Sequence, residues 1–151
     1  MSTIDDDALR NLNARIIDEF RANAGAVGGP FTGRPMVLLT IKGRKTGIER
    51  TTPLVYLPDP EPDGDRVFVF ASKGGAPEDP DWYKNLVANP DGTVEVGDQK
   101  YAARAVVVTG PERDELFERQ MKTAEQFRTY QMNTDRVIPV VALVRTSSYA
   151  R

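Results

Sequence analysis

The sequence predicts a mainly β chain with flanking helices, an α+β protein built around an antiparallel barrel. Six segments have the composition of strands, and five of them are bounded by Gly, Pro or Asp on at least one side. The connections are mostly short, and too few helices lie between the strands to cross over between parallel neighbours. With 151 residues, 40% of them hydrophobic, the chain is expected to form one domain over residues 1–151.

The first expected element is an amphipathic helix over about residues 5–22. Apolar residues, Ile16 and Phe20 among them, recur there at helical spacing. Residues 2–6 place hydroxyls three positions ahead of acids, which is typical of a capping box, and Gly25 is expected to end the helix. The helix either packs on the domain or touches a membrane surface, and its acidic residues oppose contact with anionic lipid.

Six strands are expected after a glycine-rich connector at residues 25–33. Residues 36–41 form a mostly apolar run that is long enough for a buried strand. The other expected strands are residues 51–57, 66–72, 93–96, 100–109 and 138–145. Gly97 and Asp98 form a Gly-first pair suited to a type II′ hairpin turn, so the strands on either side are expected to be antiparallel neighbours.

Two more helices are expected to interrupt the sheet. The first is short, spans about residues 82–88 and ends before Pro90. The second begins at Pro111 and continues to about Tyr130. The proline-rich residues 58–65 are expected to form an exposed loop between two strands, not a domain boundary.

The absence of histidine and cysteine excludes much catalytic chemistry. There is no imidazole base, no Ser-His-Asp triad and no thiolate nucleophile. A structural zinc site of the usual kind is excluded as well, and no metal site is expected. What remains is carboxylate, lysine, tyrosine or serine chemistry, or an enzyme whose organic cofactor carries the reaction.

Charge and hydropathy limit the partners. A net charge of −2 argues against a general nucleic-acid binder, whose phosphate contacts need a basic excess. The longest apolar stretch, residues 137–144, is far shorter than the ~20 residues of a membrane-spanning helix. The N-terminus carries aspartates in place of the basic, apolar start of a secretory signal. We expect a cytoplasmic protein without an integral membrane segment, and peripheral membrane contact stays open.

A cluster of cations marks the turn after the first strand. Lys42, Arg44, Lys45 and Arg50 lie there with two glycines and Thr46. Glycine lets backbone N–H groups approach an anion, and these side chains can donate to phosphate oxygens. The cluster therefore predicts a site for an anionic tail, and a solvated hairpin tip is the alternative.

A second polar segment, residues 71–77, ends an apolar strand. Ser72 and Lys73 with the two glycines that follow could hold the polar rim of a flat heterocycle, or they form a plain turn. Trp82 comes soon after and either packs in the core or walls an aromatic ligand. Phe127 and Tyr130 share a helix face and either pack under the last strand or approach a ligand.

The order of these segments resembles the deazaflavin-dependent nitroreductase and quinone reductase family over about residues 30–143. The matching stretches are GRKTG, TTPLVYL, ASKGGAPEDPDWYKNLVANP, TVEV and TDRVIPVV. The resemblance implies a single split β-barrel domain of the FMN-binding type and the 8-hydroxy-5-deazaflavin coenzyme F-420. The reduced coenzyme would pass hydride to an electrophilic small-molecule acceptor, which could be a quinone, a nitro compound or an activated enone or lactone.

The resemblance assigns coenzyme contacts by position. Arg44, Lys45, Thr46 and Arg50 match residues that hold the phosphate and acidic tail. The residues matched to the deazaflavin and its ribityl chain are Thr51, Thr52, Pro53, Leu54, Val55, Phe70, Ala71, Ser72, Lys73, Asp81, Trp82, Tyr83, Lys84 and Asn85. These contacts would position the coenzyme, which supplies the chemistry.

The acceptor side departs from the nitroreductase members. Phe127, which is expected beside the coenzyme, and Tyr130 fall where those members place tyrosines near the substrate. Phe127, Ala124 and Val55 each stand where such members have a tyrosine. Tyr130 and Ser72 are the catalytic candidates, because solvent or Ser72 could supply a proton for quinone or enone reduction.

Two other functions remain open at this stage. The same barrel could serve an FMN-dependent oxidoreductase, or a non-catalytic protein that carries the coenzyme. The basic turn with Arg50 favours a long anionic tail over the single phosphate of FMN. No feature separates carrier from catalyst, and both a monomer and a homodimer are compatible with the sequence.

Overall fold

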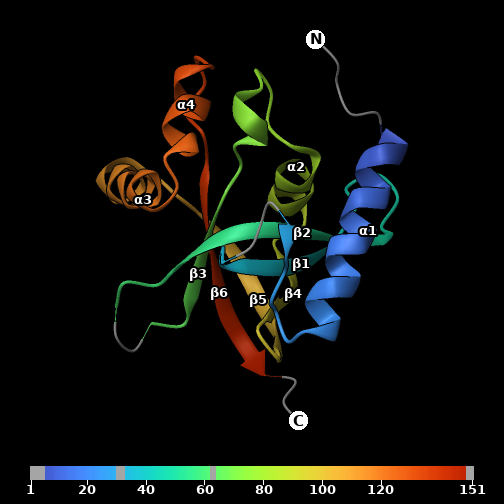
Figure 1. The fold of residues 1–151 in the computed structure, drawn as a ribbon. Coiled ribbons are helices and arrows are strands. Elements are labelled where there is room, and N and C mark those ends of the chain that lie inside the picture. Colours follow the sequence, from blue (N-terminus) through green and yellow to red (C-terminus); the bar gives the residue numbers. More distant parts are fainter. Residues whose placement is uncertain (1–5, 30–32, 62–63, 149–151) are drawn as a thin grey trace.

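A closed six-stranded barrel forms the centre of the chain in a computed structural model, which describes residues 6–29, 33–61 and 64–148 (Figure 1). The strands are β1 (Met36–Lys42), β2 (Glu49–Pro58), β3 (Arg66–Phe70), β4 (Asp91–Val96), β5 (Gln99–Val108) and β6 (Val140–Ser148). They are all antiparallel in the order β1-β2-β3-β6-β5-β4, and β4 pairs with β1 to close the barrel. The predicted antiparallel barrel is confirmed.

The first strand is mostly apolar because both of its faces are covered. Val37 and Leu39 point into the barrel core, while Met36 and Leu38 point to the other face. The hairpin between β4 and β5 is also as predicted, since Val96 pairs with Gln99 and Gly97 adopts a φ of 59°.

Helix α1 (Asp6–Ala22) packs against the outer face of β1. Ile16 and Phe20 are buried there with Met36 and Leu38. The helix ends as expected, because Gly25 takes a φ of 97° and donates its N–H to the Phe20 carbonyl over 2.8 Å. The capping pattern at residues 2–5 lies outside the described residues.

The helical region after β5 differs from the prediction. In place of one helix from Pro111 to about Tyr130, the chain forms α3 (Gly110–Thr123) and α4 (Gln126–Met132). Ala124 is extended at the break, with a φ of −140°, and is buried. The turn there places Phe127 in edge contact with Phe70 and Phe117, at centroid distances of 5.7 and 6.5 Å. Burial of these rings outweighs continuation of the helix.

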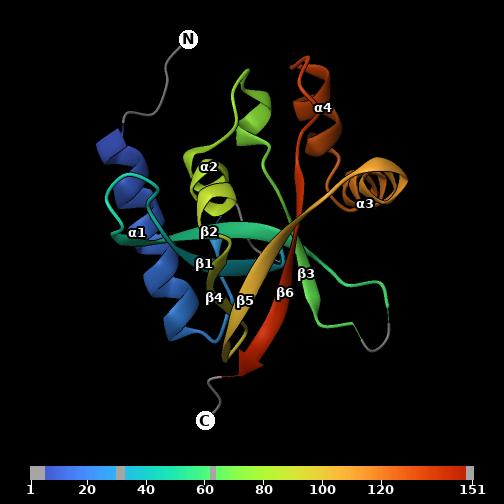
Figure 2. The ribbon, with the colours of Figure 1, turned by 180° about the vertical axis from the view of Figure 1, so that it is seen from behind.

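Several strand ends differ from the predicted bounds by one to three residues, those of β3 and β6 among them. Strand β3 ends at Phe70, and Ser72 precedes a short 3₁₀ turn, η2 (Lys73–Gly75), instead of closing the strand. Strand β6 starts at Val140, after Pro139, whose missing N–H cannot extend the ladder. Figure 2 shows that α2 (Asp81–Ala88), α3 and α4 lie toward one end of the barrel, while α1 runs along its side.

The Asp59 carboxylate, on the loop after β2, provides a test of the fold by pH. Arg66 donates a hydrogen bond to Asp59 over 3.0 Å and thereby lowers the pKa of that carboxyl. A lowered pKa stabilises the fold above the unfolded-state value near ~4 and loses this effect as pH falls through the folded-state pKa. Asp59→Asn should therefore lower the free energy of unfolding by about 1 kcal/mol at neutral pH and by less in acid.

Urea unfolding of wild type and Asp59→Asn at about pH 7 and about pH 3 measures this difference. An unchanged gap between the two chains at the two pH values would contradict the assigned ion pair.

Candidate functional site

Two adjoining cavities run along β2 between α1 and α2. One, of about 600 Å³, lies at the β1–β2 turn, and the other, of about 500 Å³, lies at the end of β3. Asn13 of α1 lines both. Thr52 lines the first cavity and its neighbour Pro53 lines the second, so the two meet along the strand. We call the two cavities together the groove, with a basic end and an apolar end.

The basic end is held in place by contacts between the β1–β2 turn and α2. The backbone N–H and the Nη1 of Arg44 both donate to the Asn85 side-chain oxygen, over 3.1 and 2.7 Å. The Nη2 of Arg44 lies 3.6 Å from the Asp81 carboxylate. These contacts of Arg44 hold the β1–β2 turn against α2. Lys45, the next residue of the turn, is positioned by the same contacts.

Lys45 and Arg50 are exposed at this end of the groove. Among the residues that the structure describes, neither forms an ion pair with an acidic side chain. Glu49 and Asp81 line the same cavity. Because neither forms an ion pair with Lys45 or Arg50, both cations can still attract an anionic ligand.

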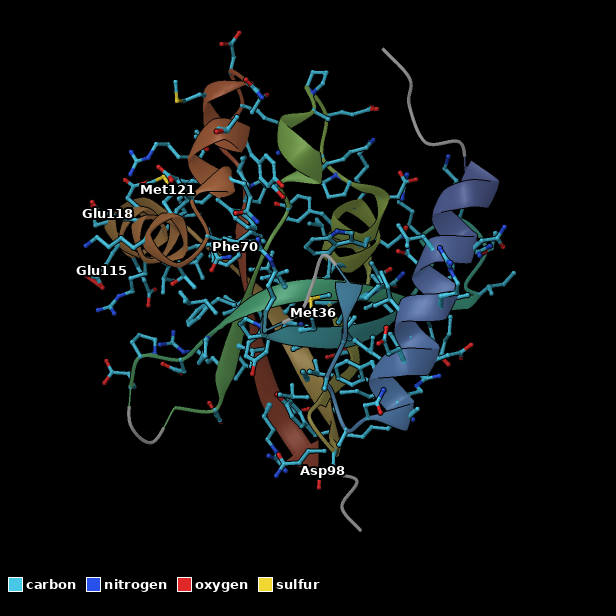
Figure 3. All side chains as sticks on the ribbon, viewed as in Figure 1. Met36, Phe70, Asp98, Glu115, Glu118 and Met121 are labelled. Carbon is cyan, nitrogen blue, oxygen red and sulfur yellow. The ribbon has the colours of Figure 1, made fainter. Side chains whose placement is uncertain are left out.

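The apolar end has hydrophobic walls on several sides. Met36 from β1 and Phe70 from β3 lie between α1 and α4 in the view of Figure 3 and line the same cavity. The other apolar and aromatic walls are Leu12, Ile16, Pro53, Leu54, Val55, Trp82 and Phe127. Such a slot suits the faces of a flat ring system.

A few polar groups lie at the apolar end. They are Asn13, Arg34, Ser72, Lys73, Gln126 and Tyr130. Lys73 has a φ of 46°, which is rare for a residue with a side chain, and its ammonium lies 3.3 Å from Glu78. The Tyr130 ring contacts the edge of Phe127 at a centroid distance of 5.1 Å. Among the described residues no carboxylate lines this cavity, so the ionisable groups found there are cations and a phenol.

Most of the predicted site residues meet in the groove. The basic end contains Arg44, Lys45, Thr46, Arg50, Thr51, Thr52, Asp81 and Asn85. The apolar end contains Pro53, Leu54, Val55, Phe70, Ser72, Lys73, Trp82, Phe127 and Tyr130. Phe127 is 6% exposed in the core and also lines the cavity, so its packing role is confirmed and its contact with a ligand stays a prediction.

Three predicted contacts do not line the groove. Ala71 is fully buried, and its carbonyl accepts a hydrogen bond from Arg136. Tyr83 lies beside cavities with Val107, away from the groove, and burial raises the pKa of its hydroxyl. Lys84 lines neither end of the groove. Successive residues of a helix point in different directions, so α2 cannot present 81–85 to one cavity.

Sequence reasoning missed the contribution of α1 and of Arg34. Leu12 and Ile16 lie on the apolar face of the helix predicted over residues 5–22, and in the structure they also line the groove. Apolar residues at helical spacing predict a helix with one apolar face, but the spacing does not show whether that face packs on the core or lines a cavity. Gln126 was missed because the break between α3 and α4 was missed.

Two kinds of feature are absent from the described part of the chain. Within residues 6–29, 33–61 and 64–148, no group of acidic side chains is arranged to hold a metal ion. In the same ranges, no helix combines the length and the apolar character needed to cross a membrane.

Solved structures with this architecture define the class of protein. One described as an F420-H2 dependent reductase is 35% identical, with a TM-score of 0.65, over 73% of this chain and 94% of its own. Another, described as a domain-swapped dimer, is 31% identical, with a TM-score of 0.66, over 91% and 97%. The heme storage protein HutZ of Vibrio cholerae, at 14% identity and a TM-score of 0.56, shares the fold. The chain is therefore a split β-barrel protein.

Sequence comparison narrows this class to one family. The family model described as F420H(2)-dependent quinone reductase matches residues 13–145. An F420H(2)-dependent quinone reductase of Mycobacterium tuberculosis (strain H37Rv) is 38% identical over 130 residues, which are 83% of this chain and 85% of the relative. The chain belongs to the F420H(2)-dependent quinone reductase family.

Proposed function

We propose that this chain is a reductase that uses the reduced deazaflavin coenzyme F-420 as hydride donor and quinones as acceptors. Family membership supports the proposal. The observation that carries it is the groove itself, in which Lys45 and Arg50 lie at one end and an aromatic and aliphatic slot lies at the other. A coenzyme with an acidic tail and a flat tricyclic ring matches both ends at once.

The residues present fit this coenzyme. Lys45 and Arg50 would hold its phosphate and acidic tail, since neither forms an ion pair with a described acidic side chain. Pro53, Leu54 and Trp82 would cover the ring, and the donors of Ser72 and Lys73 would reach its polar rim. A coenzyme with a long anionic tail would occupy both cavities, whereas FMN, with a single phosphate, would use the basic end less fully.

The reaction then rests on position and exclusion of water. When bound, the reduced deazaflavin supplies the hydride, and this chain's residues supply its surroundings. The apolar walls would limit water around a bound ring, and Arg34, together with Lys73 and its partner Glu78, would place charged groups near an acceptor oxygen that gains electron density. We propose Tyr130 and Ser72 as the hydroxyl groups nearest to an acceptor, with Phe127 shaping the same wall.

The side chains around Phe127 at the apolar end of the groove indicate which acceptors the chain would reduce. Val55 and Phe127 line the groove without a hydroxyl, and Ala124 is buried away from it. A quinone needs little help from a protein acid because its reduced oxygens take protons from solvent readily. Enones, lactones and nitro compounds depend more on a placed acid, and we propose them as secondary acceptors.

A binding titration followed by a turnover assay tests the proposed function. Oxidised coenzyme F-420 is expected to bind at least about tenfold more tightly than FMN, because its longer anionic tail engages Lys45 and Arg50. The reduced coenzyme should then be oxidised by menadione in the presence of the chain. Preference for FMN would favour an FMN-dependent enzyme, and tight binding without turnover would favour a coenzyme carrier.

Two variants of Tyr130 distinguish whether this residue shapes the pocket or donates a proton. Tyr130→Phe keeps the ring beside Phe127 and removes only the hydroxyl, so kcat with menadione should stay within about threefold of wild type. Tyr130→Ala removes part of the cavity wall and should lower kcat/KM for the acceptor by about tenfold or more.

Pre-steady-state hydride transfer in both Tyr130 variants, with a quinone and a nitroaromatic acceptor, measures these effects. A loss of about 10² in Tyr130→Phe with both acceptors would assign proton donation to the hydroxyl instead.

The assembly and location of the chain are also open to test. The relative described as a domain-swapped dimer supports a homodimer as a hypothesis for this chain. Size-exclusion chromatography with light scattering distinguishes it from a monomer. A cytoplasmic location stays a prediction of the sequence.

A further inference from the structure

Arg136 follows α4 in the sequence, and its guanidinium donates hydrogen bonds to four groups of the loop at residues 71–79. Its Nε donates to the Ala76 carbonyl over 2.9 Å, and its Nη2 donates to the Ser72 carbonyl over 2.8 Å. Its Nη1 donates to the Ala71 carbonyl over 3.1 Å and to the Asp79 carboxylate over 2.9 Å. The Arg136 side chain is only 15% exposed.

The loop that Arg136 binds carries the polar rim of the groove. Ser72 and Lys73 line the apolar end, directly after β3. The loop has few backbone hydrogen bonds of its own, and two of them close the short η2 turn, from Gly75 N to Ser72 O and from Ala76 N to Lys73 O. Lys73 adopts a positive φ there, a conformation that persists only where its surroundings impose it. The Arg136 contacts are such a constraint.

Arg136 is itself tied to the helix that carries Tyr130. The Gln131 amide of α4 donates to the Arg136 carbonyl over 2.8 Å and accepts from the Ile138 N–H over 3.0 Å. Gly75 also packs directly on the α4 backbone, since a Cβ there would lie 2.6 Å from the Tyr130 carbonyl oxygen. The rim and α4 are thus connected by both an arginine and a close backbone contact.

We infer that Arg136 is a positioning residue that fixes the Ser72 and Lys73 rim against α4. This inference rests on the proposed function. The contacts of Arg136 fix the distance between two sides of the apolar end of the groove. One side is the Ser72 and Lys73 rim, which would meet the coenzyme ring, and the other is α4, which carries Tyr130. A hydride moves only between closely placed atoms, so a change in this spacing lowers the rate even in a folded chain. Arg136 itself does not line the groove.

Arg136→Gln and Arg136→Lys test the inference, with Arg66→Gln as the matched control. Arg66, on β3, is also a partly buried arginine with a carboxylate partner, Asp59, but it lies outside the groove. Well below each melting temperature, Arg136→Gln should raise the Kd for coenzyme F-420 and lower kcat with menadione, each by about tenfold. Arg136→Lys keeps the charge but not the planar fork and should fall between Arg136→Gln and wild type.

The control separates positioning from general stability. Arg66→Gln should lower Tm and leave Kd and kcat within about twofold of wild type. If Arg136→Gln behaves in the same way, the inference is overturned. If Arg136→Gln does not fold, Arg136→Lys decides, since a Kd and kcat equal to wild type would overturn the inference as well.

Hydrogen exchange gives a readout that needs no coenzyme. Amides of residues 72–79 should exchange faster in Arg136→Gln than in wild type, and Arg66→Gln should leave them unchanged. Unchanged exchange in Arg136→Gln would overturn the positioning role alone. A wild-type chain that binds no coenzyme F-420 would instead overturn the proposed function.

Discussion

The Lys45→Ala, Arg50→Ala double variant is expected to bind coenzyme F-420 about 100-fold more weakly than wild type. Both cations lie in the basic end of the groove, and neither is paired with an acid among the described residues. A charge-assisted contact with a phosphate or carboxylate contributes about 1.5 kcal/mol or more, which is about tenfold in affinity for each side chain. Fluorescence titration with the oxidised coenzyme measures the loss.

Salt dependence and a charge-matched control complete this test. Raising salt from about 50 to about 300 mM should weaken wild-type binding more than binding by the double variant. Arg119→Ala, Lys122→Ala removes the same charge from α3, where neither residue lines the groove. That control should keep wild-type affinity. If the Lys45→Ala, Arg50→Ala variant and wild type bind the coenzyme with equal affinity, the basic end of the groove is not part of the coenzyme site.

Gly75→Ala is expected to lower both stability and turnover. The new Cβ would lie 2.6 Å from the Tyr130 carbonyl oxygen, so α4 and the rim must move apart. Gly75 also has a φ of 85°, where a side chain adds about 1–2 kcal/mol of strain. We expect the free energy of unfolding to fall by about 3 kcal/mol and kcat with menadione by about tenfold.

Gly110→Ala is the matched control for this variant. Gly110 has a φ of 68°, but a Cβ there would meet nothing within 4 Å. It should therefore show the backbone strain alone, about 1–2 kcal/mol by urea unfolding, with kcat unchanged. An equal loss of stability in the two variants, together with normal kcat in Gly75→Ala, would show that the contact between Gly75 and α4 has no role in the site.

The architecture could be predicted because it depends on local patterns. The six apolar segments, their short connections and the Gly97 turn limit the chain to an antiparallel barrel, and the barrel found has this form. The basic turn was also visible, because four cations and two glycines close together in sequence lie close together in space. Local chemistry of this kind needs no tertiary information.

The tertiary structure decided how these parts combine. Only packing could end α3 at Thr123, since burial of Phe127 against Phe70 and Phe117 outweighs the helical preference of the residues between. Only the fold could make α1 a wall of the groove. Arg136 is 57 residues or more along the chain from every group of the loop that it donates to. Contacts across such separations depend on the closed barrel, so no local pattern of residues records them.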